Sequence, residues 1–231
     1  QGIVVFNTPG ANANAVKELV IAGLLISSRR VISGIEWAKT LKGEGDAVGK
    51  LVEKGKGAFA GPEILGKTLG VIGLGAIGRQ VATLAEAFGC NVAYYSTSGV
   101  AREEKYPRME LSELLAWADV VSIHSPLNAQ TAGLIGSEQL QQMKPTAIII
   151  NVARGGIIDE TALANALNNK TIAGAALDVF SKEPLPSSPL YDLNDNYSLL
   201  ASPHTAWAAD DAVEKLIEGV YTNIKEFLLS L

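Results

Sequence analysis

The sequence predicts an α/β fold built around a doubly wound parallel sheet, and three observations predict it. Short apolar runs alternate with helical patterns over most of the 231 residues, as in parallel sheets covered by helices on both faces. The runs at 146–153 and 171–179 are apolar nearly throughout, which indicates strands buried on both sides. A glycine cluster at 73–78 joins a strand directly to a helix, the short connection that such sheets use.

The elements are expected in a regular order along the chain. Apolar runs predict strands at 3–6, 68–73, 91–96, 119–124, 146–153, 171–179 and 197–202. Apolar residues at helical spacing predict helices at 14–30, 76–88, 111–118, 137–143, 159–169 and 208–229. Asn14 and Ser112 are expected to cap two of these helices, and Arg29 and Arg30 to lie in a last turn, where the helix dipole favours cations. The residues at 38–67, rich in glycine and lysine, predict an extended surface connection.

Composition and charge exclude several classes of protein. The net charge is −5 and no basic block is present, so no nucleic-acid partner is expected. No apolar run reaches the ~18 residues that a membrane span requires, so no membrane association is expected, and no signal peptide is visible. Cys90 is the single cysteine, which excludes a disulfide framework and favours a cytoplasmic location. We predict no metal site.

The glycines of VIGLGAIGRQ, residues 71–80, follow the spacing G-x-G-x-x-G. After a strand and before a helix, this spacing is typical of a dinucleotide-binding turn. Gly73 permits the tight turn, Gly75 lets the backbone approach a pyrophosphate, and Gly78 lets the helix pack closely on the strand. A purely structural turn is the alternative, and the repeated strand–helix units favour the dinucleotide.

The acid that usually accompanies this turn is missing. It is expected at the end of the second strand, where it binds the adenosine ribose, but Ser96 stands there. A serine does not repel a 2′-phosphate, and Arg102 and Lys105 follow closely, either as phosphate ligands or as ordinary surface charges. The choice between NAD and NADP therefore stays open.

Charged residues follow three later strands of the predicted sheet. Arg154 comes after the fourth strand, Asp178 and Glu183 after the fifth, and His204 after the sixth. Ligands of open α/β sheets bind outside the carboxyl ends of the strands, so these groups are expected on the rim that holds the glycine loop. An arginine can bind a carboxylate, and a histidine beside a glutamate can exchange a proton in a fixed tautomer.

Five stretches occur in one order: the glycine loop, HSPL at 124–127, NVARGGIIDE at 151–160, LDVFSKEPL at 177–185 and SPHTAW at 202–207. Together they resemble the D-isomer-specific 2-hydroxyacid dehydrogenases over essentially the whole chain. The early GIVVFNTPGANANAVKELV is most similar to 3-phosphoglycerate dehydrogenases, whereas YYSTSG and SPHTAWA are more similar to glycerate dehydrogenases (hydroxypyruvate reductases). The resemblance implies hydride transfer between NAD(P)H and a small 2-keto acid, giving a D-2-hydroxy acid.

The resemblance also implies roles for single residues. Arg154 would bind the carboxylate and carbonyl oxygen of the substrate, His204 would donate the proton, and Glu183 would pair with His204. The implied cofactor contacts are Gly73, Gly75, Ala76, Ile77 and Gly78 at the pyrophosphate, Ser96 at the ribose, Val152, Ala153, Arg154 and Asp178 at the nicotinamide, and His124 and Pro126 as a wall. His124 is explained equally well as a half-buried structural histidine.

In this family the nucleotide domain is inserted into a substrate-binding domain, which is expected to be largely missing here. Residues 1–8 are then its remnant, 9–206 the Rossmann domain, and 207–231 a helix that returns towards the missing part. The helix at 14–30 is apolar nearly all round, which predicts a homodimer interface. We expect cofactor binding with poor turnover by this chain alone. The alternative is a non-catalytic NAD(H) sensor or scaffold of the corepressor type.

Overall fold

The computed structural model describes residues 3–99, 105–183, 188–193 and 198–230. Its centre is a six-stranded sheet in the order β2-β1-β3-β4-β5-β6, in which every neighbouring pair is parallel. The strands are β1 (Thr68–Ile72), β2 (Asn91–Tyr95), β3 (Val120–Ile123), β4 (Ile148–Asn151), β5 (Gly174–Leu177) and β6 (Leu199–Ala201). Because the chain goes from β1 outward to β2 and then returns to β3, a topological switch point lies between β1 and β3.

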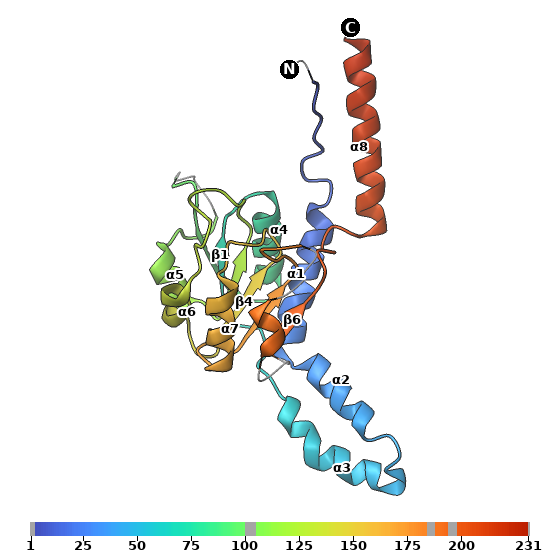
Figure 1. The fold of residues 1–231 in the computed structure, drawn as a ribbon, viewed down its shortest axis with the longest axis vertical. Helices are drawn as coiled ribbons and strands as arrows, with labels where there is room; N and C mark the ends of the chain where they lie inside the picture. The colour runs from blue at the N-terminus through green and yellow to red at the C-terminus, as the bar shows by residue number, and fades with distance from the viewer. Residues whose placement is uncertain (1–2, 100–104, 184–187, 194–197, 231) are drawn as a thin grey trace.

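Helices cover both faces of this sheet, as the sequence predicts (Figure 1). One face carries α1 (Ala13–Ser28) and α4 (Ala76–Ala87), and the other carries α5 (Leu111–Trp117), α6 (Ser137–Gln142) and α7 (Glu160–Asn168). Neighbouring strand residues point to opposite faces, so Val71 packs in the cluster of α1 and α4 and Ile72 in that of α5, α6 and α7. The doubly wound parallel sheet is confirmed.

The strand predicted at 3–6 is wrong. Residues 3–8 have no regular secondary structure and run beside α8 (Asp210–Leu229) (Figure 1). Phe6 packs edge-on against Phe227 with ring centroids 5.7 Å apart, and Asn223 Nδ2 donates to Asn7 O at 3.1 Å. The segment lies against a helix, which offers no strand ladder for its backbone to join.

The predicted ends of the first helix are also wrong. α1 follows Asn12 as its N-cap, and Asn14 lies inside the first turn, where its side chain bonds along the helix. The helix ends at Ser28 with Arg29 as C-cap, and Arg30 has a left-handed φ of 46°. The two arginines therefore lie between two helices, where the helical backbone is interrupted.

The extended connection predicted for 38–67 is wrong over residues 38–59. This part is helical and projects from the sheet domain as a hairpin (Figure 1). It contains α2 (Val31–Thr40) and α3 (Val48–Gly55), with 3-10 turns at Gly45–Ala47 and Lys56–Phe59. Trp37 packs on Phe59 with ring centroids 5.1 Å apart. The i, i+3, i+4 spacing of Val48, Leu51 and Val52 is a helical signal that the surrounding glycines and lysines hide.

Ser112 does not cap α5, contrary to prediction. The N-cap is Glu110, which forms a capping box with Glu113, and Glu110 N–H donates to Glu113 Oε2 at 3.4 Å. Ser112 lies exposed in the first turn. α7 begins at Glu160, one residue after the predicted start, because the Asp159 carboxylate caps it by accepting hydrogen bonds from Thr161 N–H and Ala162 N–H.

α8 extends away from the sheet domain, with residues 3–8 alongside (Figure 1). Of its described residues only Ala212 is buried. Its exposed large apolar side chains are Val213, Ile217, Val220, Tyr221, Ile224, Leu228 and Leu229. The division of the chain into a remnant of the substrate-binding domain (1–8), a Rossmann domain (9–206) and a returning helix (207–231) stays a prediction. No helix in the described part of the chain is both long and apolar enough to cross a membrane.

Candidate functional site

The carboxyl ends of the strands form one rim of the sheet, and the strand register decides what lies along it. Ile72, Ile123, Asn151, Leu177 and Ala201 are register partners in one row from β1 to β6. The residues that follow them lie just beyond the sheet, where open α/β folds bind their ligands. We call the residues that follow β1, β2 and β3 the cofactor half, and those that follow β4, β5 and β6 the catalytic half.

The glycine loop follows β1 and turns directly into α4. Gly73 has a φ of 93°, a left-handed conformation that favours glycine. A Cβ on Gly78 would lie 2.3 Å from Gly73 O, so helix and loop touch through their backbones. A Cβ on Gly75 would meet nothing within 4 Å, so the outer side of the loop is open to a ligand.

The amino end of α4 is built to receive an anion. Its N-cap is Gly75, no described side chain caps it, and its first turn contains no acid. The first turn includes Ala76, Ile77 and Gly78, whose N–H groups lie at the positive end of the helix dipole. The loop and helix therefore fit the pyrophosphate that the sequence predicts there.

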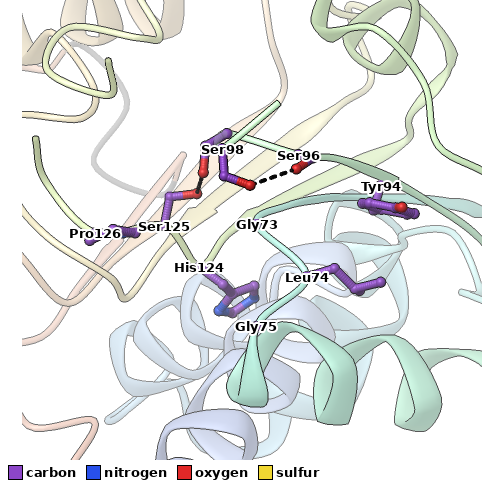
Figure 2. A pocket seen from close by; sticks show the side chains of 10 residues that line it. Gly73, Leu74, Gly75, Tyr94, Ser96, Ser98, His124, Ser125 and Pro126 are labelled. Carbon is purple, nitrogen blue, oxygen red and sulfur yellow. Dashed lines mark hydrogen bonds between the residues drawn. The ribbon is translucent and has the colours of Figure 1, made fainter. Parts of the chain in front are cut away.

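A pocket of about 200 Å³ lies beside this loop, at the ends of β1, β2 and β3 (Figure 2). It is lined by Gly73, Leu74, Gly75, Tyr94, Ser96, Thr97, Ser98, His124, Ser125 and Pro126. The pocket brings together the predicted contacts Ser96, His124 and Pro126. The sequence analysis did not name Thr97 and Ser98 as lining residues. The run of three hydroxyl residues directly after β2 could have indicated them.

His124 is half-buried at the end of β3, and its ring lies beside the glycine loop (Figure 2). Its Nε2 lies 2.8 Å from Ser122 Oγ. Burial lowers the pKa of His124 from 6.5 to about 4, so the ring is neutral at neutral pH. His124 therefore contributes shape and hydrogen bonding to the cofactor half, and no charge.

Arg154 lies in the turn after β4, which the buried Asn151 holds in place. Asn151 Nδ2 donates to Arg154 O at 2.9 Å, and its Oδ1 accepts from Ala153 N–H at 3.0 Å. Gly155 then packs against the loop after β5, because a Cβ there would lie 1.8 Å from Phe180 O. Arg154 is exposed, and Val152 and Ala153 are half-buried. Sequence reasoning missed Asn151, a polar residue at the end of an apolar strand.

His204 and Glu183 come from different strand ends and meet on the rim. His204 Nδ1 lies 2.5 Å from Glu183 Oε2, and Phe180 N–H donates to Glu183 Oε1 at 2.8 Å. Burial raises the pKa of Glu183, but the Phe180 N–H, His204 and Arg154 outweigh it, so the pKa is lowered. The charged carboxylate accepts the Nδ1–H and leaves Nε2 to exchange a proton. The His204 side chain is 41% exposed, so a ligand can reach the ring.

Asp178 is fully buried after β5 and holds the loop that carries His204. Its Oδ1 accepts from Ser202 Oγ at 2.6 Å and from Thr205 N–H at 2.9 Å, and its Oδ2 accepts from Ala206 N–H at 2.7 Å. His204 itself has a φ of 55°, which is uncommon for a residue other than glycine. The structure thus gives Asp178 a positioning role, and its contact with nicotinamide stays a prediction.

Of the two cations considered for a 2′-phosphate, Lys105 is the one within the described residues, and it does not line the pocket. Arg102 lies outside the described residues. Lys105 forms an ion pair with Glu86 of α4, which also accepts from Tyr106 OH at 3.2 Å. Within the described ranges, no group of His, Cys, Asp and Glu could hold a metal ion. The rim therefore combines an anion-binding loop with one proton donor and one exposed arginine.

The chain is similar in sequence to known proteins. The family described as "D-isomer specific 2-hydroxyacid dehydrogenase, NAD binding domain" matches residues 22–206. D-3-phosphoglycerate dehydrogenase of Mycobacterium leprae is 39% identical over 227 residues, which are 95% of this chain and 40% of that protein. Glyoxylate reductase of Korarchaeum cryptofilum is 37% identical over 238 residues, 98% of this chain and 67% of that protein.

A solved structure agrees with these relatives. D-lactate dehydrogenase from Aquifex aeolicus, complexed with NAD and lactic acid, matches with a TM-score of 0.85 at 28% identity. The match covers 99% of this chain and 70% of that one. Among the curated relatives, the matched part of this chain spans 40% of the length of the phosphoglycerate dehydrogenase.

Proposed function

Because this chain belongs to the D-isomer specific 2-hydroxyacid dehydrogenase family through its NAD-binding domain, we propose that the protein containing it interconverts a small 2-keto acid and a D-2-hydroxy acid. The bound nicotinamide supplies or accepts the hydride at the C2 carbon of the acid. The residues of this chain bind the cofactor, hold the substrate and move the proton.

The observation that carries the proposal is the pair of His204 and Glu183. Reduction of a keto group needs a proton at the carbonyl oxygen as the hydride arrives at carbon. Glu183 accepts the Nδ1–H of His204 at 2.5 Å, so Nε2 faces the substrate and delivers the proton. The carboxylate also stabilises the imidazolium that forms when the reaction runs towards the keto acid.

Arg154 is proposed to bind the substrate. Its guanidinium offers two parallel N–H donors, which match a carboxylate or a carboxylate and the adjacent carbonyl oxygen. Asn151 fixes the backbone of this turn through hydrogen bonds of 2.9 Å to Arg154 O and 3.0 Å from Ala153 N–H. The position of the Arg154 Cα is therefore defined, although its side chain is exposed. Binding at Arg154 brings the C2 carbon of the acid onto the rim beside His204.

The substrate is proposed to be 3-phosphoglycerate or the pair of glycerate and hydroxypyruvate. The relatives named D-3-phosphoglycerate dehydrogenase and glyoxylate reductase support small acids of this kind. Both groups carry a carboxylate next to the reacting carbon, so Arg154 serves either. The groups that separate these substrates lie beyond C2, away from Arg154 and His204.

The test separates cofactor binding from chemistry. The protein that contains this chain and its His204→Asn variant are compared for NADH oxidation with hydroxypyruvate or glyoxylate, and for NAD reduction with 3-phosphoglycerate. Loss of the proton donor should lower kcat about 10²–10⁴-fold, with NADH affinity unchanged. A variant that retains full activity would overturn the proposal. A sensor or scaffold of the corepressor type would bind NADH without turnover of any of these acids.

We also propose that the protein is a cytoplasmic homodimer that pairs through α1 and the adjoining α2. The sheet covers Val20 and Leu24 of α1, but Leu25, Ile32 and Ile35 on these two helices are exposed. Light scattering should give twice the chain mass, and Ile32→Glu with Ile35→Glu should give the monomer.

Cys90 is a free, buried thiol, as expected in a reducing compartment.

A further inference from the structure

Glu160 is the first residue of α7, and its carboxylate joins α7 to the chain segment that follows β5. Ser181 N–H donates to Glu160 Oε1 at 2.6 Å, and Ser188 Oγ donates to Glu160 Oε2 at 2.8 Å. Ser188 Oγ also accepts from Leu190 N–H at 3.3 Å. The two oxygens of one side chain therefore hold the segment after β5 at two separate points.

This segment carries the carboxylate of the proton-transfer pair. Phe180 N–H donates to Glu183 Oε1 at 2.8 Å, and Glu183 Oε2 lies 2.5 Å from His204 Nδ1. The next backbone N–H along the chain, that of Ser181, is the one that Glu160 accepts. Consecutive peptide groups are rigid planes joined at one Cα. Fixing the second N–H therefore limits the movement of the first, on which the position of Glu183 depends.

The amino end of α7 is also linked to the turn that carries Arg154. Residues 155–159 connect Arg154 to Glu160, and a Cβ on Gly155 would lie 1.8 Å from Phe180 O. The turn after β4 and the segment after β5 thus touch through their backbones, and Glu160 ties the segment to the helix that follows the turn. Glu160 does not line the pocket of the cofactor half.

We propose that Glu160 is a positioning residue for proton transfer, which it supports by holding Glu183 within reach of His204. This inference rests on the proposed function, in which His204 donates the proton. The Glu183 side chain is 33% exposed, so its place depends on the backbone of its own segment more than on core packing. A carboxylate accepts hydrogen bonds about twice as strong as those between neutral groups, which suits Glu160 to hold that backbone.

The protein that contains this chain tests the proposal through two variants of Glu160. Glu160→Ala removes both acceptors and should lower kcat with hydroxypyruvate or glyoxylate about tenfold, because the proton donor loses its alignment. The KM of the keto acid and the affinity for NADH should change less than about threefold. Glu160→Gln should keep kcat within about twofold of the parent, because the amide oxygen can accept from Ser181 N–H and the amide NH₂ can donate to Ser188 Oγ.

A second measurement, on this chain, follows the ring of His204 itself. A histidine ring is neutral at about pH 9, and its nitrogen-15 shifts then report which nitrogen carries the proton. Glu183 favours the Nδ1–H tautomer, because a carboxylate only accepts. Glu160→Ala should move His204 towards the Nε2–H tautomer, and Glu160→Gln should not. His204→Asn assigns the signals, since the chain contains two histidines.

Glu138→Ala is the matched control, because it removes an exposed carboxylate from the first turn of α6; it should change neither kcat nor the tautomer. Parental kcat or an unchanged tautomer in Glu160→Ala overturns this inference and leaves the proposed function intact. Glu160→Gln as slow as Glu160→Ala, or a loss of NADH affinity equal to the loss of kcat, overturns it as well. A parent protein that turns over none of the proposed acids overturns the proposed function, and this inference with it.

Discussion

The cofactor half and the catalytic half of the rim present different kinds of chemical group. In the cofactor half, backbone N–H groups, hydroxyls and a histidine of low pKa surround the pocket, and none of the described lining residues is charged at neutral pH. In the catalytic half, Arg154, Glu183 and His204 present ionisable side chains, and the buried carboxylate of Asp178 holds the loop that carries His204. We therefore propose that backbone shape governs cofactor binding and that side-chain charge governs the chemistry.

This difference predicts that each half can be damaged without the other. Changes of backbone shape should weaken cofactor binding and leave the proton-transfer group in place. Changes of a single charged or hydrogen-bonding side chain should lower turnover and leave the cofactor affinity nearly unchanged. The following changes test that separation, beginning with the largest effect.

Asp178→Asn should damage the catalytic half most. The asparagine keeps one acceptor oxygen, so the N–H groups of Thr205 and Ala206 cannot both keep their partners, and an NH₂ group faces one of them. We expect kcat to fall about 10²–10³-fold as the His204 loop shifts, with unfolding about 1–3 kcal/mol easier. Stopped-flow turnover and urea unfolding measure the two effects. Asp159→Asn is the matched control, since asparagine caps α7 as well as aspartate does.

A fall in NADH affinity that parallels the fall in kcat would show that Asp178 supports both halves. Full turnover by the variant would remove its positioning role.

Gly78→Ala should damage the cofactor half. The added methyl would lie 2.3 Å from Gly73 O, and a backbone atom cannot give way as a side-chain end does. Overpacking of this kind costs about 1–3 kcal/mol, so NADH affinity should fall about 10–100-fold as the glycine loop moves away from α4. Fluorescence titration with NADH measures it.

Gly49→Ala is the control for this change. A Cβ at Gly49 in α3 meets nothing within 4 Å, so that variant should bind NADH normally and unfold no more easily. If Gly78→Ala binds NADH as tightly as the parent chain, the close approach of loop and helix does not set the affinity.

The pH dependence of stability should separate the halves as well. The unfolded chain takes up a proton on His124 near pH 6.5, whereas the folded chain does so only near pH 4. Stability therefore falls as pH decreases between these values, by about 2 kcal/mol from pH 7.5 to pH 5. The lowered pKa of Glu183 acts in the same direction, but only below the usual 4.5 of a glutamate.

Urea unfolding of the chain and of His124→Asn at the two pH values measures this loss. The variant should lose about 2 kcal/mol less, and His204 is present in both proteins, so its contribution cancels. Equal losses would place the protonation elsewhere.

The sequence was sufficient for the sheet and for most of the rim. Strands that alternate with helices are expected to be parallel, and the carboxyl ends of parallel strands lie at the same edge. The places of Glu183 and His204 after successive strands therefore predicted their meeting, which their 2.5 Å contact confirms, whereas the joint action of Arg154 with them stays a prediction. Ser96 was found in the same way, through the acid that is missing after β2.

Features that depend on small energy differences could not be predicted. Ser112 and Glu110 are both able to begin α5, and the capping box with Glu113 decides for Glu110, a choice worth about 1 kcal/mol. The positioning contacts of Asn151 arise from the local turn, which strand patterns do not describe. Trp37 and Phe59 meet only once their hairpin has formed.

The smallest effect is expected from Lys105, which the sequence offers as a ligand for a 2′-phosphate. The structure pairs it with Glu86 on the surface of α4, and exposed pairs of this kind contribute about 0–1 kcal/mol. Lys105→Met should change NADH and NADPH affinity less than about twofold and leave turnover unchanged. Glu86→Gln is the control, because it frees Lys105 without removing it. A selective loss of NADPH affinity in Lys105→Met, with a gain in Glu86→Gln, would show that the cofactor half also uses charge, and the contrast with the catalytic half would then be one of degree.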